Sequence, residues 1–221
     1  MKATDWTTYY GKKRSWFSKF TQQYTQREIE NAIQKCAAQN GGEPIEILEL
    51  GGGNRCFAEQ ICLKFNVKTY NIIDNNELAA KLFDAMELNA EEHKSILYDL
   101  LDRDSQPTGT YDFVFSVGLI EHFRGADINT VIDQHYLHCK ENGCVMITFP
   151  TPTGKYQITR KFMELVGMWQ FHDEMPLKWS DVAGHFLKCG TVLAHYINWK
   201  LPLTQMVVIN RNSKKTQTDN A

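Results

Sequence analysis

A glycine-rich turn between a short apolar strand and a helical stretch constrains the fold of this chain more than any other feature. The predicted strand covers residues 45–50 and runs directly into Gly51-Gly52-Gly53-Asn54, after which a helical pattern extends over residues 55–65. Glycines at such a turn let backbone N–H groups approach a ligand without obstruction by side chains. The segment therefore predicts a strand–turn–helix unit with a ligand beside its turn.

The alternation of strands and helices continues beyond this unit. Its further elements are predicted as strands at residues 67–74, 93–97, 111–117 and 143–149, and as helices at residues 77–88 and 127–138. This alternation implies a parallel sheet with helices on both faces. Two late apolar runs, residues 187–197 and 205–210, are joined by a short turn that favours an antiparallel hairpin. We therefore predict a doubly wound α/β fold with seven strands, mostly parallel, and an antiparallel last strand.

The segments around the predicted sheet suggest the domain organisation. Residues 1–42 carry aromatic and aliphatic side chains at helical spacing and predict a helical cap ahead of one domain over residues 43–210. Within that domain, residues 150–186 include an aromatic stretch without a clean period, and we expect them to form an insertion that shapes the substrate pocket. Residues 211–221 are polar and predict a frayed tail.

Charge and cysteine content limit the partners and the location. The chain has 24 basic and 26 acidic residues, so no basic surface for nucleic acid is expected. No stretch approaches the roughly 20 apolar residues that cross a membrane, and the N-terminus lacks the apolar segment of a secretion signal. We therefore expect a cytoplasmic protein with no membrane partner. The six cysteines form no C-x-x-C pair, which favours buried reduced thiols and neither disulfides nor a metal.

An acidic residue at the end of the second predicted strand makes the glycine turn a more specific signal for a ligand site. Asp74 lies about 20 residues after the turn, where a carboxylate can accept hydrogen bonds from both hydroxyls of a ribose. Each feature alone is a weak signal, but the two together indicate a ligand that contains adenosine. Asp74 could also cap the following helix, and the two roles are compatible.

From residue 45 to about residue 150, the chain resembles the class I S-adenosylmethionine-dependent methyltransferases. In that family an acidic residue, a glycine-rich turn, a second-strand acid and a fourth-strand segment recur in this order. The matching residues are Glu49, Gly51, Gly53, Asp74, Asp99 and the run Ser116-Val117-Gly118-Leu119-Ile120-Glu121-His122-Phe123. The run is similar to the S-x-G-x-x-E-H-F segment common in members that act on small molecules. The resemblance implies a methyltransferase that uses S-adenosyl-L-methionine.

The resemblance also implies which residues hold this cofactor. They are Glu49, Gly51, Gly52, Gly53, Asp74, Asn75, Asp99, Leu100, Ser116 and Val117. Glu49 would hold the ammonium group, Asp74 the ribose and Asp99 the adenine amino group. Asp99 lies in a polar loop and could instead be merely solvated. The sequence departs from the family at Arg55, where a third glycine is common, and this departure puts the geometry of the turn in doubt.

His122 is the first candidate for a catalytic base, and Glu121 could orient it or face the cofactor. His122 follows the fourth predicted strand, at the edge where open parallel sheets bind ligands. A hydroxyl acceptor benefits from a base by roughly 10²–10⁴ in rate, whereas an unprotonated amine needs none. A purely structural role for His122 is the alternative, and His172, Asp173 or His185 in the insertion could then serve as the base.

These features favour O-methylation of a small molecule such as a secondary metabolite, a sugar, or a glycan or lipid precursor. N-methylation and an RNA or protein substrate are alternatives, and an RNA substrate would require a basic stripe on the cofactor face. A nicotinamide-dependent oxidoreductase shares the turn and the ribose acid but would have Gly or Ala in place of Cys56. A noncatalytic cofactor-binding module is a further alternative, which detectable turnover would exclude. The oligomeric state is not predicted.

Overall fold

A seven-stranded sheet with the strand order β3-β2-β1-β4-β5-β7-β6 forms the centre of the protein. The computed structural model describes residues 4–11, 16–37, 42–102 and 109–213, and the side chains of residues 16–20 are not described. The strands are β1 (Ile45–Leu50), β2 (Val67–Asp74), β3 (Ala90–Leu97), β4 (Tyr111–Val117), β5 (Cys139–Pro150), β6 (Gly190–Asn198) and β7 (Gln205–Asn212). The neighbouring strands from β3 to β5 are parallel, and β7 is antiparallel to both β5 and β6. The predicted doubly wound fold with an antiparallel last strand is confirmed.

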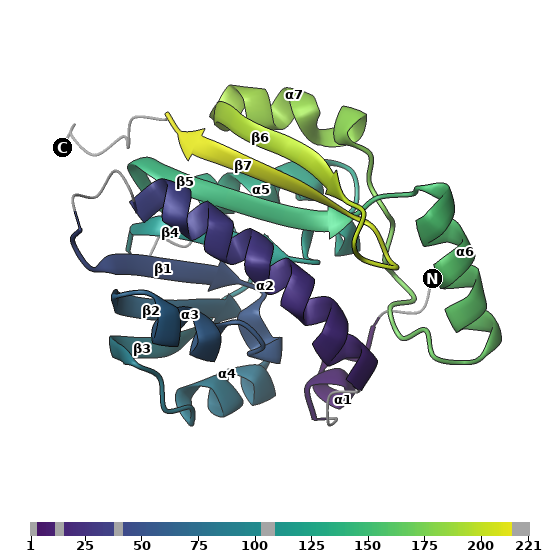
Figure 1. Ribbon diagram of the computed structural model, residues 1–221, viewed down its shortest axis with the longest axis horizontal. Coiled ribbons are helices and arrows are strands. Elements are labelled where there is room, and N and C mark those ends of the chain that lie inside the picture. The colour runs from purple at the N-terminus through teal and green to yellow at the C-terminus, as the bar shows by residue number, and fades with distance from the viewer. Residues whose placement is uncertain (1–3, 12–15, 38–41, 103–108, 214–221) are drawn as a thin grey trace.

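Helices cover both faces of this sheet (Figure 1). They are α1 (Trp6–Gly11), α2 (Trp16–Ala37), α3 (Ala58–Lys64), α4 (Glu77–Asp84), α5 (Ala126–Leu137), α6 (Gly154–Leu165) and α7 (Trp179–Cys189), with short 3-10 helices η1 (Gly52–Asn54) and η2 (Ile120–His122). One core joins the sheet to α2 and α3, and the other joins it to α5 and α7. Strands β1, β2 and β4 are buried along most of their length, because helices cover both faces of the sheet.

The C-terminal part of the insertion is more regular than the sequence suggested. The insertion expected over residues 150–186 includes most of α7, which begins at Trp179 and continues to Cys189. Its buried residues Val182, Phe186 and Cys189 recur at helical spacing, and they pack against the sheet. The strand expected to begin at residue 187 therefore begins at Gly190. At the end of the chain, β7 extends to Asn212, and the rest of the predicted tail from residue 214 lies outside the described residues.

The expectation that all cysteines are reduced is wrong for one pair. Cys36 in α2 and Cys144 in β5 form a disulfide, with their Cα atoms 6.2 Å apart. The two residues are far apart in the sequence, so their spacing gives no sign that the fold brings them together. The other four cysteines take no part in a disulfide: Cys56, Cys62, Cys139 and Cys189.

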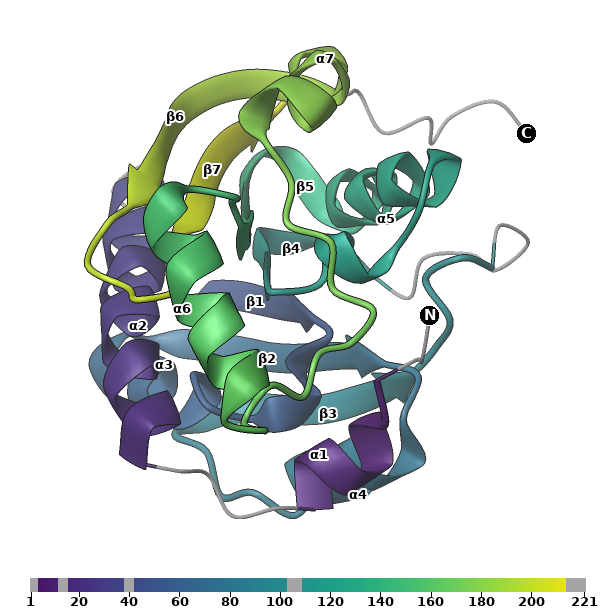
Figure 2. The same cartoon turned by 90° about the vertical axis from the view of Figure 1, so that its right-hand side faces the viewer.

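The carboxyl ends of the parallel strands meet at one edge of the sheet, which faces the viewer in Figure 2. Helices α1 and α6 and the segment between α6 and α7 lie across this edge (Figure 2). Open parallel sheets bind ligands at this edge, where the strand order reverses between β1 and β4. Among the helices that the structure describes, none has the length and apolar character needed to span a bilayer.

Candidate active site

A cavity of about 350 Å³ lies at this edge, next to the ends of β1, β2 and β4. Its volume falls in the range of roughly 300–1,000 Å³ that is usual for sites that bind small molecules. Six of the predicted cofactor residues line it: Gly51, Asp74, Asn75, Asp99, Leu100 and Val117. Gly118, Glu121 and His122 from the fourth-strand segment line it as well. The fold therefore brings most of the predicted site residues to one cavity.

The backbone of the glycine turn lies close to the side chains of Leu119 and Asp74. Gly51 has a φ of +69°, and a Cβ atom there would lie 3.0 Å from Leu119 Cδ1. The N–H group of Gly53 donates a hydrogen bond to Asp74 Oδ2 at 3.0 Å, and a Cβ atom on Gly53 would lie 2.6 Å from that oxygen. Arg55, where the family often has glycine, adopts a left-handed conformation with a φ of +57°. The turn thus keeps the backbone geometry despite the departure in sequence.

Asp74 faces the cavity with a carboxylate that is already partly hydrogen bonded. Its Oδ1 accepts a hydrogen bond from the N–H group of Asn76 at 2.9 Å, and its Oδ2 accepts one from the Tyr10 hydroxyl at 3.2 Å. Burial raises the pKa of Asp74, although its backbone hydrogen bonds oppose that shift. Helix α4 is capped by Asn76, whose side chain accepts hydrogen bonds from Leu78 and Ala79. The capping role considered for Asp74 therefore belongs to Asn76.

Four predicted cofactor residues do not line the cavity: Glu49, Gly52, Gly53 and Ser116. The Glu49 side chain is buried behind Gly52, where it accepts a hydrogen bond from the Tyr70 hydroxyl at 2.6 Å. Burial raises the pKa of Glu49 to about 7. The structure therefore does not bring its carboxyl group to the cavity, because Gly52 and the Tyr70 hydrogen bond keep it inside the fold. Gly53 contributes through its contact with Asp74.

Ser116 is turned away from the cavity towards α5. Its hydroxyl lies 2.8 Å from Nε2 of the fully buried His135, whose Nδ1 lies 2.8 Å from the carbonyl oxygen of Val131. Burial lowers the pKa of His135 to about 3, so this imidazole is neutral in the folded chain. Ser116, His135 and Val131 thus form an internal hydrogen-bond chain away from the cavity.

Because His135 is buried, we expect the folded protein to lose stability in acid. The unfolded chain binds a proton on His135 below a pH of about 6.5, whereas the folded chain does not until about pH 3. The free energy of unfolding should therefore fall as the pH drops between these values, by at most about 1.4 kcal/mol per pH unit from this residue. Urea unfolding at pH 7 and pH 5 should show a smaller loss in His135→Gln than in the unmodified chain. Equal losses in both would contradict this assignment.

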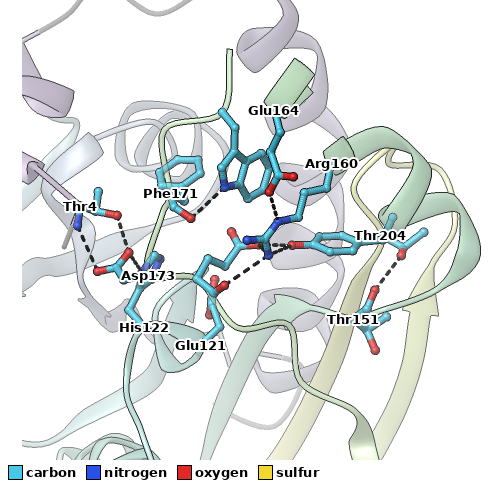
Figure 3. Close-up of polar contacts among 12 residues, drawn as sticks. Thr4, Glu121, His122, Thr151, Arg160, Glu164, Phe171, Asp173 and Thr204 are labelled. Carbon is cyan, nitrogen blue, oxygen red and sulfur yellow. Dashed lines mark hydrogen bonds and ion pairs between the residues drawn. The ribbon is translucent and has the colours of Figure 1, made fainter. Parts of the chain in front are cut away.

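His122 and Asp173 form a hydrogen-bonded pair on the cavity wall (Figure 3). His122 Nδ1 lies 3.0 Å from Asp173 Oδ1, and Asp173 also accepts hydrogen bonds from the backbone N–H and the hydroxyl of Thr4. Burial lowers the pKa of His122, although the charge of Asp173 opposes that shift. Asp173, rather than Glu121, is therefore the residue that orients the imidazole. Trp6 packs its edge against the ring at a centroid distance of 4.9 Å.

Two buried glutamates lie beside this pair. Glu121 and Glu174 both line the cavity, and burial raises the pKa of each carboxyl group, with the charge of Glu174 adding to the shift of Glu121. The Tyr156 hydroxyl donates a hydrogen bond to Glu174 Oε1, and Arg160 Nη1 donates to the Tyr156 oxygen at 3.2 Å. No signal in the sequence pointed to Glu174, Tyr156 or Arg160 as site residues. No motif links them to Glu121, because they come from the insertion and meet it only in the fold.

The remaining base candidates lie elsewhere. His172 is exposed and does not line the cavity, and His185 is on α7, with Nε2 3.3 Å from Asp133 Oδ1. Helix α1 contributes its aromatic residues Trp6, Tyr9 and Tyr10 to the cavity wall. The N-terminal helical segment thus lies over the predicted cofactor site.

Comparisons with known proteins agree with this geometry. The family described as methyltransferase domain matches residues 21–185. The fold is similar to that of magnesium protoporphyrin IX methyltransferase from Synechocystis PCC 6803 with bound SAH, with a TM-score of 0.68. The two sequences are 12% identical, and the match covers 94% of this chain and 93% of that one. The N-methyltransferase NodS from Bradyrhizobium japonicum WM9, in complex with S-adenosylhomocysteine, has a TM-score of 0.56 and 12% identity, with 85% and 88% covered.

A third similar structure is an O-methyltransferase family protein from Burkholderia thailandensis, with a TM-score of 0.60, 18% identity, and 77% of this chain and 52% of that one covered. At these identities the structures show a shared fold. A comparison with curated proteins gave no match to the sequence. The family match also decides against the nicotinamide-dependent oxidoreductase considered above. The glycine turn and the Asp74 carboxylate that Gly53 approaches agree with the matched family domain. Together they show that this chain belongs to the class I S-adenosylmethionine-dependent methyltransferases.

Proposed function

We propose that this enzyme methylates a hydroxyl oxygen of a small molecule, with His122 as the general base. The observation that carries the proposal is the His122–Asp173 pair, 3.0 Å between Nδ1 and Oδ1, on the wall of the cavity that also contains Asp74. The pKa of His122 is lowered by burial, so its imidazole is neutral near pH 7 and can accept a proton. An unprotonated amine would have no need of such a base.

The cofactor side of the cavity carries residues that could hold S-adenosylmethionine once the Tyr10 side chain leaves Asp74 and Gly53. Asp74 would accept hydrogen bonds from the ribose hydroxyls, in place of the one it accepts from Tyr10. Asn75, Asp99 and Leu100 would contact the adenine, and Gly51 and Val117 would border the rest of the molecule. When bound, the cofactor supplies a methyl group on a positively charged sulfur.

The acceptor side supplies the proton transfer. With Nδ1 directed to Asp173, His122 Nε2 is the ring nitrogen that would take the proton from an acceptor hydroxyl. Asp173 then stabilises the imidazolium that forms. Glu121, whose pKa is raised by burial, would position the acceptor through a hydrogen bond. The aromatic residues of α1 exclude water from the reacting groups.

The lining of the cavity favours a small acceptor over nucleic acid. Within the described part of the chain, neither Lys nor Arg lines it, so phosphate groups would find no cationic partner there. Aromatic and apolar side chains such as Phe171, Met163 and Leu203 make up much of the wall. Such a lining is typical of pockets that enclose most of a small ligand.

A panel of acceptors tests the proposed reaction. The protein would be incubated with S-adenosylmethionine and separate pools of hydroxyl compounds (sugars, phenols, hydroxylated lipid precursors), amines and RNA. Formation of S-adenosylhomocysteine and of the methylated product would be followed by mass spectrometry. We expect product from a hydroxyl pool. Turnover of amines or RNA alone would contradict O-methylation of a small molecule.

Asp173→Asn is expected to lower kcat by part of the roughly 10²–10⁴ that a positioned base contributes, because the His122 ring loses its oriented partner. The charge of Asp173 raises the pKa of His122, so its removal should also move the acidic limb of the pH–rate profile to lower pH. The exposed Asp127→Asn, which makes the same charge change, is the control. A profile and kcat equal to those of the control would exclude Asp173 as the positioning residue.

A further inference from the structure

A second group of metal-ligating side chains lies between α5 and α7, outside the cavity. Asp133 comes from α5, and His185 and Cys189 come from α7, one helical turn apart on the same face. None of the three lines the cavity described above. We propose that these three residues form a zinc site that fastens α7 to α5.

Two of the three separations between the donor atoms match those around a shared zinc ion. Cys189 Sγ and His185 Nε2 each lie 3.3 Å from Asp133 Oδ1, and all three atoms lie within 4.8 Å of one another. Tetrahedral zinc bonds of about 2.0–2.3 Å place neighbouring donor atoms roughly 3.3–3.8 Å apart. Small side-chain adjustments therefore bring the three donors to coordination distance.

One polar atom of this cluster has no hydrogen-bond partner. His185 Nε2 is buried and makes no hydrogen bond, although Asp133 Oδ1 is only 3.3 Å away. Polar atoms buried in this way usually have a partner, and a metal ion bound to Nε2 would provide one. His185 Nε2 therefore lies close to Asp133 Oδ1 but does not meet the criteria for a hydrogen bond to it. This arrangement suits a nitrogen that binds a metal ion shared with Asp133.

The chemistry and the exposure of the cluster indicate zinc. A thiolate, an imidazole and a carboxylate form a donor set typical of zinc, whereas calcium and magnesium prefer oxygen donors alone. The side chain of Asp133 is 46% exposed and that of His185 is 20% exposed, while Cys189 is buried. The site therefore has an entry path and room for water as a fourth ligand.

Zinc at this place would act on the segment that shapes the acceptor side. Residues 171–177 lead into α7 and carry Asp173 and Glu174, which lie at the active site. A bond through the metal from α7 to α5 would fix the end of this segment against the main fold. Because the unfolded chain lacks the assembled site, zinc should also raise the Tm of the protein.

Zinc binding to the purified chain tests the proposal. The metal-free protein, prepared with a chelator and kept reduced with a phosphine, would be titrated with Zn²⁺ alone by calorimetry, with Tm measured in parallel. We expect one zinc per chain, a rise in Tm, and a Kd at least about 10-fold weaker in His185→Asn and Asp133→Asn. With Co²⁺ in place of Zn²⁺, Cys189→Ser should lose the thiolate charge-transfer band.

Two controls keep the test specific. His195→Asn removes an exposed imidazole that stacks on Trp179, outside the cluster, and should bind zinc like the unmodified chain. His122→Asn reports on Glu121, His122 and Glu174, the other described group with suitable donors. Binding lost in His122→Asn but kept in His185→Asn would overturn the proposal, as would the absence of zinc binding. Cys189 is buried, so the partly exposed His185 and Asp133 decide the outcome if Cys189→Ser fails to fold.

Discussion

Asp74→Ala is expected to weaken binding of S-adenosylmethionine and of S-adenosylhomocysteine by about 1–3 kcal/mol, roughly 5- to 150-fold in Kd. The variant removes the carboxylate that the Gly53 N–H group approaches at 3.0 Å and that faces the cavity at the end of β2. Charge-assisted hydrogen bonds to the two ribose hydroxyls would be lost together. Isothermal calorimetry with each compound measures the effect directly.

A matched control separates binding from local damage. Glu77→Gln removes one negative charge from an exposed side chain in the first turn of α4, close to Asp74 but away from the cavity. Its Kd should equal that of the unmodified chain, and its Tm shows the effect of a surface charge change alone. Asp74→Asn keeps the shape of the side chain and should weaken binding in the same direction. Unchanged affinity in both Asp74 variants would refute the ribose assignment.

His122→Ala is expected to lower kcat by roughly 10²–10⁴ while the Kd of S-adenosylmethionine stays nearly the same. The imidazole is the neutral group on the acceptor side, and Asp74 on the cofactor side is left intact. Steady-state kinetics with a hydroxyl acceptor and calorimetry with the cofactor separate the two effects. His172→Ala, which removes an exposed imidazole from the neighbouring segment, is the control and should turn over normally.

The pH dependence of the rate is an independent test of the role of His122. The base form of His122 must be present for turnover, and burial places its pKa below the usual 6.5. The rate should therefore rise with pH through a limb below pH 6.5 and be level near pH 7. A limb centred well above pH 7, or a full rate in His122→Ala, would assign the proton transfer to another group.

The fold was predictable from the sequence because its signals are local. The apolar runs of β1, β2 and β4 are buried on both faces, so their boundaries agree with the predicted residues 45–50, 67–74 and 111–117. Helix α7 was missed because its aromatic residues, such as Trp179, obscure the period that Val182 and Phe186 follow. The disulfide between Cys36 and Cys144 depends on contact between α2 and β5, which no local pattern reveals.

The difference between local signals and contacts made only in the fold also explains which parts of the candidate site were predicted. The cofactor side is formed at strand ends, so the glycine turn and Asp74 were found from their positions along the chain. Glu49 was placed by resemblance alone, and its hydrogen bond to Tyr70 keeps it away from the cavity. The acceptor side joins η2 to the segment between α6 and α7. Glu174 therefore became visible only when the fold brought it to the same cavity as Glu121.

A crystal structure of the chain with S-adenosylhomocysteine tests the central claim most directly. We expect the nucleoside in the cavity between the ends of β1, β2 and β4, with both ribose hydroxyls within hydrogen-bond distance of the Asp74 carboxylate and the sulfur on the side of His122. The Tyr10 hydroxyl should then have left Asp74 Oδ2. A ligand bound elsewhere, with Tyr10 still on Asp74, would contradict this account of the enzyme.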